Sequence, residues 1–382
     1  MKKRINFSFF KNNILKKGSA SINTLDSITN KQMMLILITV IGLNNHVFVI
    51  SPLVQHAGKD SWISVILSFL LSLVWIILLL VLQKSINNEG IFEWLRFKVN
   101  KKIIIILGII FILFLINLSA ITLRETIALI NVGYLPETPK WIVACIFSIV
   151  CLYFGGSKLG TISIINILLL IFVVCLGFFV AFTNMEHKDY SLLLPIFENG
   201  YRPILKSIIF PYSGMTELML FLFLKKRINT PVKFRHLFIT SFILMGLTLG
   251  PLIGAITEFD EVEASYQRFP AFEEWGLVSI GDFIEHVSFL ALYQWLAGAF
   301  IRISLFFYTI KEVLLEINLY SKWCLFVILF IVIGYAVYPI SDIHYSNVLW
   351  NILLPFTTYF LISFLLLLSL FILVLHKRRI NV

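Results

Sequence analysis

Polar residues that could bind a small zwitterion gather at two places in an otherwise apolar sequence. The two groups are Gly42, Asn44, Asn45 and His46, and Tyr212, Ser213, Gly214 and Glu217. Glycine tolerates an unwound backbone, and the nearby prolines Pro52 and Pro211 donate no backbone hydrogen bond, so backbone groups are freed at both places. Freed N–H groups at helix N-termini favour a carboxylate, and freed carbonyls favour an ammonium group or a cation. These residues therefore predict a binding site for a molecule such as an amino acid.

Ionisable side chains also stand inside apolar segments, at Arg124 with Glu125, at Glu217 and at Arg302. A charge near the centre of a bilayer costs roughly 2.5 to 3.5 kcal/mol, so each of these groups needs a partner or a wet cavity. Glu217 follows Gly214 by about one helical turn, where its carboxylate could accept a hydrogen bond from a ligand amine. We include both Arg302 and Arg124 among the candidate ligand-binding residues, because either could neutralise Glu217. A purely structural Glu–Arg pair is the alternative.

Catalytic chemistry is not indicated. The sequence offers no nucleophile–base pair, no phosphate-binding loop and no His/Cys cluster at metal-ligand spacing. We therefore predict no enzyme activity, no metal site and no cofactor. His46, as a lone histidine, has a structural role as its alternative interpretation.

The elements that must position these residues are membrane-spanning helices. Of the 382 residues, 59% are hydrophobic and 14% are charged, against roughly 25% charged in soluble domains. Runs of about 20 apolar residues can cross the hydrocarbon core. The predicted spans are 32–54, 61–82, 103–132, 141–155, 159–183, 203–224, 236–257, 284–310, 323–340 and 347–375. The sequence thus predicts an all-α integral membrane protein with one transmembrane domain (32–375) between basic tails at 1–31 and 376–382.

The distribution of basic residues predicts the orientation. With ten spans, the loop lysines and arginines fall almost entirely on the side that carries both termini. The exceptions are Lys59, Lys140, Lys188, Arg202 and Arg268. This is the positive-inside pattern, so both termini are predicted to be cytoplasmic.

Ten spans also divide into two halves of five, about 32–183 and 203–375. Because five is odd, two such halves in tandem lie in the membrane with opposite orientations, as in many secondary transporters. The first and sixth helices then correspond, and both carry the helix-breaking residues described above. The fold expected is a 5+5 inverted repeat with broken first and sixth helices, although simple helix kinks are the alternative at either position.

Two segments outside the spans have unusual charge. Residues 258–283 are predicted to form an outer cap rich in acidic side chains, which repel anions or collect cations unless the segment is a simple solvated loop. Residues 91–98 mix aromatic and basic side chains, as expected of a short helix at the lipid headgroups.

Several short motifs occur along the chain: Ala57 to Val65, Leu135 to Pro139, Leu194 to Ile196, Glu217 to Leu222, Phe269-Pro270, Ile280 to Glu285 and Trp295 to Tyr308. These motifs resemble those of the spore germination permeases, the B subunits of germinant receptors. Together they cover roughly residues 27 to 380. Where many relatives carry a second glycine in the first helix, this chain has Asn44, which makes the predicted pocket wall more polar.

The resemblance implies a fold like that of the amino-acid/polyamine/organocation (LeuT-like) transporters and a place in the inner membrane of the bacterial endospore. It also implies A and C subunits of a germinant receptor as partners, and a small-molecule germinant as ligand: an amino acid first, or a nucleoside or sugar. The expected function is germinant sensing. A secondary amino-acid permease coupled to a proton or cation is the alternative, and a scaffold that only anchors partner subunits is a third interpretation.

Overall fold

A computed structural model describes residues 26–86, 89–96, 98–279 and 287–380, with side chains up to Phe371. These residues are helical apart from their connecting turns, and their only extended pairing is a parallel bridge between Ile28 and Ile228. The predicted motif at Ile280 to Glu285 and residues 1–25 of the predicted basic tail lie outside the described residues.

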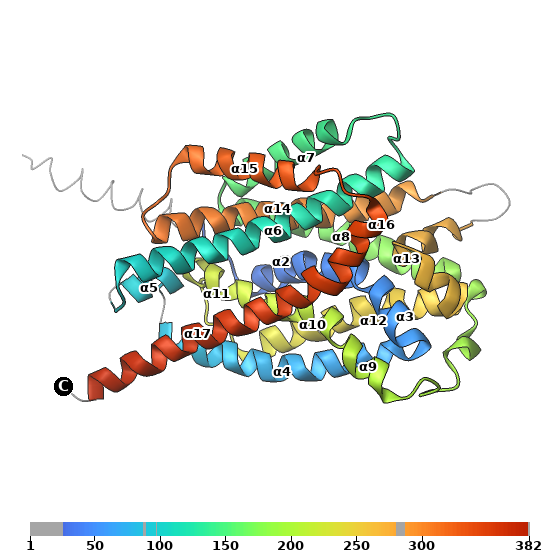
Figure 1. Ribbon diagram of the computed structural model, residues 1–382, viewed down its shortest axis with the longest axis horizontal. Coiled ribbons are helices and arrows are strands. Elements are labelled where there is room, and N and C mark those ends of the chain that lie inside the picture. Colours follow the sequence, from blue (N-terminus) through green and yellow to red (C-terminus); the bar gives the residue numbers. More distant parts are fainter. Residues whose placement is uncertain (1–25, 87–88, 97, 280–286, 381–382) are drawn as a thin grey trace, which may run out of the picture.

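Long helices run lengthwise through the molecule and form one bundle (Figure 1). These helices are α2 (Asn30–Leu43), α4 (Ser61–Ile86), α6 (Lys101–Gly133), α7 (Lys140–Gly155), α8 (Leu159–Thr183), α12 (Phe234–Tyr266), α14 (Phe289–Glu316), α15 (Lys322–Ala336) and α17 (Leu354–Ile380). The shorter helices are α3 (Ile50–Ala57), α5 (Ile91–Arg96), α9 (Tyr201–Ser207), α10 (Ile209–Thr216), α11 (Leu220–Leu224), α13 (Pro270–Glu273) and α16 (Asp342–Val348).

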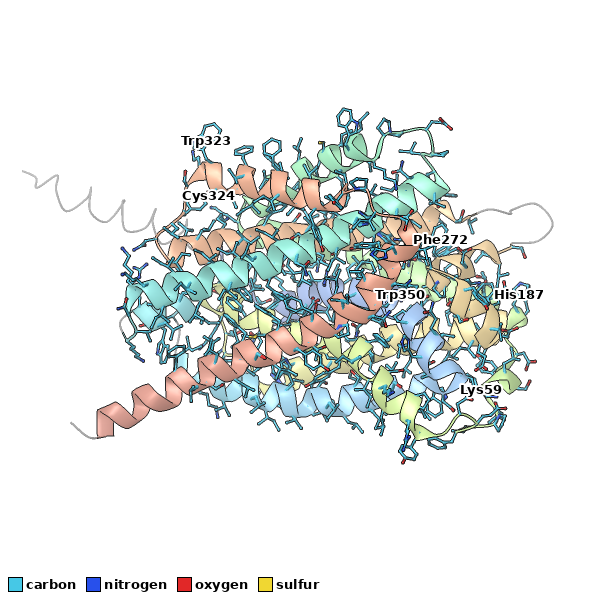
Figure 2. All side chains as sticks on the ribbon, in the orientation of Figure 1. Lys59, His187, Phe272, Trp323, Cys324 and Trp350 are labelled. Atoms are coloured by element: carbon cyan, nitrogen blue, oxygen red, sulfur yellow. The ribbon has the colours of Figure 1, made fainter. Side chains whose placement is uncertain are left out.

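The two ends of the bundle differ. One end carries α13, α9 and the turn Tyr190–Leu193, and we call it the cap end; α5 and the C-terminus lie at the opposite end (Figure 1). Lys59, His187 and Phe272 lie at the cap end, whereas Trp323, at the start of α15, lies toward the other (Figure 2). The loops predicted to be outer lie at the cap end and those predicted to be inner lie at the opposite end, whereas the orientation in the membrane stays a prediction.

Seven helical segments among the described residues are long and apolar enough to cross a membrane. They are Ile50–Ile86, Lys101–Gly133, Leu159–His187, Tyr201–Arg227, Phe234–Tyr266, Phe289–Glu316 and Asp342–Phe371. Two shorter apolar helices, α7 and α15, lie beside them. The predicted all-helical integral membrane class is thus confirmed, whereas the count of ten spans and the inverted repeat stay predictions.

Two segments differ from their sequence-based descriptions. The helix predicted for 236–257 is followed by a second helical segment that reaches Tyr266, and the two are separated at Asp260, whose backbone is not helical (φ 64°). The Asp260 carboxylate accepts from the N–H groups of Val262 and Glu263 and so caps the second segment. Residues 91–96 of the predicted 91–98 segment form helix α5, but Ile91, Phe92, Trp94 and Leu95 are buried in the protein. The expectation that this helix lies at the lipid headgroups was therefore wrong for its apolar face.

Aromatic side chains fill the bundle between α6, α11 and α17. The Phe111 and Phe223 ring centroids are 3.9 Å apart, and those of Phe114 and Phe360 are 4.2 Å apart. Such stacked pairs add about 0.5 to 1.5 kcal/mol each beyond the burial of their area. This packing fixes α11, the last part of the predicted sixth span, inside the bundle.

Helices α7 and α14 approach closely at Gly155. A Cβ atom at this position would lie 2.5 Å from the Cβ of Phe307 and 2.8 Å from the carbonyl oxygen of Ser304. Glycine lets two membrane helices come this close, where any side chain would separate them.

Gly155→Ala should therefore destabilise the protein by roughly 1 to 3 kcal/mol, because the added methyl group overpacks the α7–α14 contact. The melting temperature of the purified protein in detergent measures the change. Gly246→Ala on α12 is the matched control, since a Cβ there meets nothing within 4 Å. Equal melting temperatures for Gly155→Ala and Gly246→Ala would contradict the close contact between α7 and α14 at Gly155.

Candidate functional site

Of the two predicted helix breaks, the first coincides with a change of helical pitch, whereas the second, Pro211 to Gly214, lies inside the regular helix α10, and a change of pitch follows it. We call the two helices that contain these changes of pitch the interrupted helices. Between α2 and α3 the residues Asn44–Phe48 form a π-helical turn, which often occurs at functional sites. Between α10 and α11 the residues Glu217–Met219 form a tighter 3₁₀ turn. Both changes of helical pitch disturb the regular hydrogen-bond ladder of the backbone.

The two interrupted helices touch through polar side chains. The Nδ2 atom of Asn44 donates to Oγ of Ser213 over 3.4 Å, and Nδ2 of Asn45 donates to the carbonyl oxygen of Pro211 over 3.4 Å. Asn44 also donates to Oδ1 of Asn45 over 3.3 Å. Both asparagines are buried. The sequence-predicted residues Asn44, Asn45 and Ser213 are therefore brought together.

Gly214 makes this contact possible. A Cβ atom at position 214 would lie 1.7 Å from Oδ1 of Asn45 and 3.0 Å from Nδ2 of Asn44. A contact of 1.7 Å is far below van der Waals separation, so no other residue fits without displacing Asn45. The glycine is needed for the close approach of two helices.

Backbone oxygens near the 3₁₀ turn find side-chain partners. The Thr216 carbonyl accepts from Nε1 of Trp75 over 3.2 Å, and the Phe210 carbonyl accepts from Oγ of Ser213 over 2.6 Å. Buried backbone groups need such partners, since an unpaired one costs about as much as a lost hydrogen bond. Trp75 on α4 thus supports the interrupted helix from outside.

Glu217 and Arg302 form a buried, two-pronged ion pair. Arg302 Nη1 lies 2.6 Å from Glu217 Oε2, and Nη2 lies 2.7 Å from Oε1. Each residue is 1% exposed. Arg302 also donates to Oγ1 of Thr122 over 3.1 Å and to the carbonyl oxygen of Val40. One guanidinium group therefore connects α14 to α2, α6 and the 3₁₀ turn after α10.

The arginine that neutralises Glu217 is Arg302 and not Arg124. Each carboxylate oxygen of Glu217 accepts a hydrogen bond from Arg302, so the charge of the glutamate is neutralised within the protein. A direct contact between Glu217 and a ligand amine stays a prediction.

Arg124 lies elsewhere, beside the loop that follows α15. Its guanidinium donates to the carbonyl oxygens of Ala336, Tyr338 and Ile340 over 2.7 to 3.3 Å. These carbonyls include the orphan acceptors that a helix C-terminus leaves unpaired, so Arg124 caps α15. Arg124 therefore does not lie near Glu217, and its inclusion with that group was wrong. The sequence could not show this, because the partners of Arg124 are loop carbonyls, which every residue carries.

The remaining predicted residues border the contact. His46 faces α12, where its Nδ1 lies 3.1 Å from the carbonyl oxygen of Leu247. A Cβ on Gly42 would lie 3.3 Å from the Leu247 side chain, so Gly42 also faces α12. Tyr212 is partly buried against the main hydrophobic core. These three residues lie on the interrupted helices, and none of them forms a hydrogen bond with Asn45 or Glu217 among the described residues.

Sequence reasoning missed Thr122 and Trp75, and it named Trp295 only as part of a family motif, without a role near the site. Nε1 of Trp295 donates to Oγ1 of Thr126 over 3.1 Å, and Thr126 lies one turn after Thr122 on α6. The spacing of two threonines four residues apart beside Arg124 and Glu125 is a signal that could have marked this polar face.

Residues 27–344 match the model of a protein family that is described as spore germination protein. Spore germination protein XB of Bacillus anthracis is 41% identical over 349 residues, which cover 91% of this chain and 98% of that protein. Spore germination protein GerQB of Bacillus cereus is 27% identical over 61% of this chain and 68% of its own length. Spore germination protein A2 of Bacillus subtilis (strain 168) is 25% identical over 84% of this chain and 88% of its own length.

Gly214→Ala should destabilise the protein by roughly 1 to 3 kcal/mol, because the methyl group collides with Asn45. In an Asn45→Ala background the collision is removed, so Gly214→Ala should cost much less there. The coupling between the two sites, measured by thermal melting of the four proteins, is expected to be about 0.5 to 3 kcal/mol. Strictly additive effects would contradict the contact.

Glu217→Leu should lower stability by roughly 3 to 5 kcal/mol, because it leaves the Arg302 guanidinium buried and unpaired. The double variant Glu217→Leu/Arg302→Met removes both charges, and most of the loss should return. Protein accumulation in membranes and melting in detergent report both effects. If Glu217→Leu alone behaved like the wild type, the pair would not support the fold.

Proposed function

Because the chain belongs to the spore germination permease family, we propose that it is the germinant-sensing membrane subunit of a spore germinant receptor. It binds a small molecule, an amino acid in the first place, where the two interrupted helices meet. A nucleoside or a sugar is the alternative class of germinant. The proposal concerns binding and signalling, without a chemical reaction.

The observation that carries the proposal is the length of the asparagine hydrogen bonds. Asn44 and Asn45 bond Ser213, Pro211 and each other over 3.3 to 3.4 Å. Hydrogen bonds between N–H and oxygen are commonest at about 2.9 to 3.0 Å, so these contacts are weak. A ligand carboxylate would accept from the same amides in charge-assisted bonds of about 2.7 to 2.9 Å. Exchange of internal bonds for ligand bonds therefore favours binding.

The Glu217–Arg302 pair supports this site rather than contacting the ligand. Its bonds of 2.6 and 2.7 Å are short, and the same arginine holds the Val40 carbonyl on α2. Val40 precedes the π-helical turn by one helical turn. The pair thus fixes one end of the interrupted first helix while the weakly bonded asparagines stay free to rearrange.

An aromatic wall beside the π-helical turn suits the apolar part of a ligand. Phe48 packs edge-on against Trp295 with ring centroids 6.0 Å apart, and Trp295 packs against Phe269 at 4.8 Å. Phe269 directly precedes α13 at the cap end. A movement of Phe48 would therefore be transmitted through Trp295 and Phe269 to α13 at the cap end.

In this proposal, ligand binding shifts an equilibrium between two arrangements of the interrupted helices, and partner subunits respond to the change. The chain spans the inner membrane of the endospore ten times as a 5+5 inverted repeat, with both termini on the core side. The A and C subunits of the receptor are its partners. The match to the named relatives and the apolar helices support this assignment.

Spores of the source organism that lack this chain should lose dipicolinate release in response to one germinant class within a panel of amino acids, nucleosides and sugars. Complementation with the wild-type gene should restore the response to that class alone. An unchanged profile across the panel would contradict the sensing role.

A separate measurement distinguishes sensing from transport. Purified protein in liposomes should bind the germinant saturably without exchanging labelled germinant across the membrane. Sustained exchange driven by a proton or cation gradient would instead establish a secondary permease.

A further inference from the structure

One arginine joins the two interrupted helices at the end of the bundle that carries α5, opposite the cap end, and we call it the α5 end (Figure 1). Arg227 ends the turn that follows α11. Its guanidinium lies 2.9 Å from an oxygen of Asp26, which precedes α2, and 3.1 Å from an oxygen of Glu312 on α14. Asp26 also accepts from the backbone N–H of Leu159, at the start of α8, over 3.0 Å. Four segments of the chain therefore meet around Arg227.

Backbone hydrogen bonds join the same two helices. The N–H of Ile28 donates to the carbonyl oxygen of Arg227 over 2.8 Å, and the N–H of Asn229 donates to the carbonyl oxygen of Ile28 over 2.9 Å. Nδ2 of Asn30, the first residue of α2, donates to the carbonyl oxygen of Pro231 over 3.0 Å. The start of the first interrupted helix is thus bound to the end of the second.

The Arg227 contacts are more exposed to water than the Glu217–Arg302 pair. The side chains of Arg227, Asp26 and Glu312 are 28%, 19% and 11% exposed, whereas those of Arg302 and Glu217 are 2% and 1% exposed. Arg227 and Glu312 also line a cavity of about 160 Å³. Water can solvate charges that separate at the α5 end, whereas separated charges in the buried pair would stay desolvated. Breaking the Arg227 contacts therefore costs far less free energy than breaking the buried pair.

Each interrupted helix changes its pitch beyond these contacts, toward the cap end. The changes are the π-helical turn Asn44–Phe48 after α2 and the 3₁₀ turn Glu217–Met219 before α11. A 3₁₀ stretch inside a helix often marks a hinge, and π-helical turns often occur at functional sites. Arg302 holds Glu217 and the carbonyl oxygen of Val40 beside these two turns. The buried pair is therefore a fixed point about which α2 and α11 can turn.

We propose that Asp26, Arg227 and Glu312 form a latch that keeps the α5 end closed, and that release of the latch lets α2 and α11 separate there. A few partly exposed ion pairs favour the closed arrangement only modestly, so a ligand can shift the equilibrium. The latch is a property of the chain without ligand. Its link to germinant binding, which would favour release, rests on the proposed function.

Hydrogen exchange of backbone amides tests the latch in the purified full-length chain in lipid nanodiscs. The amides of Ile28 and Asn229 are bonded across the latch, so they exchange when it opens. Arg227→Gln removes the charge-assisted bonds, and both amides should then exchange at least about tenfold faster than in the wild type. Peptides from the contact between α6 and α14 should keep their exchange rates, and the melting temperature should change little.

Lys226→Gln is the matched control. Lys226 directly precedes Arg227 and pairs with Glu93 on α5, where the two side chains are 40% and 36% exposed. This variant removes one positive charge from the same turn but leaves the latch intact, so Ile28 and Asn229 should exchange at the wild-type rate. Glu312→Gln should accelerate their exchange, but less than Arg227→Gln does, because Asp26 keeps its partner.

A measurement on spores connects the latch to sensing. If the germinant favours the released arrangement, a weaker latch raises its apparent affinity, because affinity and release are linked. Spores with Arg227→Gln should then release dipicolinate at a germinant concentration at least about threefold lower than wild-type spores. Faster amide exchange with an unchanged germinant response would contradict the proposed sensing function and not the latch.

Two results would overturn the latch. Unchanged exchange of the Ile28 and Asn229 amides in Arg227→Gln would show that the ion pairs do not hold the α5 end closed. Equal acceleration in all peptides, with a lower melting temperature, would show that Arg227 supports the whole fold instead. Neither result depends on the germinant.

Discussion

A charge cannot stay unpaired inside a membrane protein, and the Glu217–Arg302 pair shows how much structure that constraint determines. The guanidinium group meets both oxygens of one carboxylate, the Thr122 hydroxyl and the Val40 carbonyl. Four helical segments must converge on one point to supply these partners. Removing one partner is far more damaging than removing both, because the desolvation cost of the remaining charge is then uncompensated.

The interrupted helices depend on this fixed point. With α2 and α14 held by Arg302, the π-helical turn at Asn44–Phe48 lies against the segment that contains Gly214, and the missing side chain of Gly214 leaves room for Asn45. The tight ion pair and the loose asparagine contacts lie side by side. A rigid support beside weakly bonded amides allows a ligand to rearrange the amides without unfolding the helices around them.

The polar residues of this arrangement could be predicted from residue types, because glycine, proline and isolated charges are conspicuous in apolar sequence. The position of the second change of pitch could not, since Pro211 to Gly214 lie inside helix α10 and the 3₁₀ turn begins at Glu217. The partner of Glu217 could not be predicted, since Arg124 and Arg302 look alike in sequence and differ only in what surrounds them. Arg124 caps α15 through loop carbonyls, which every residue carries. Trp75 and Thr122 were missed for the same reason: their partners are a backbone oxygen and a distant arginine.

The central claim is that a germinant binds where Asn44 and Asn45 meet the Ser213–Gly214 segment. The most direct test is equilibrium binding of a labelled germinant to the purified chain in lipid nanodiscs, for the wild type and for Asn45→Leu. The account predicts saturable binding to the wild type and at least about tenfold weaker binding to Asn45→Leu, the loss of about one charge-assisted hydrogen bond. Equal affinity in two proteins that melt at the same temperature would contradict it.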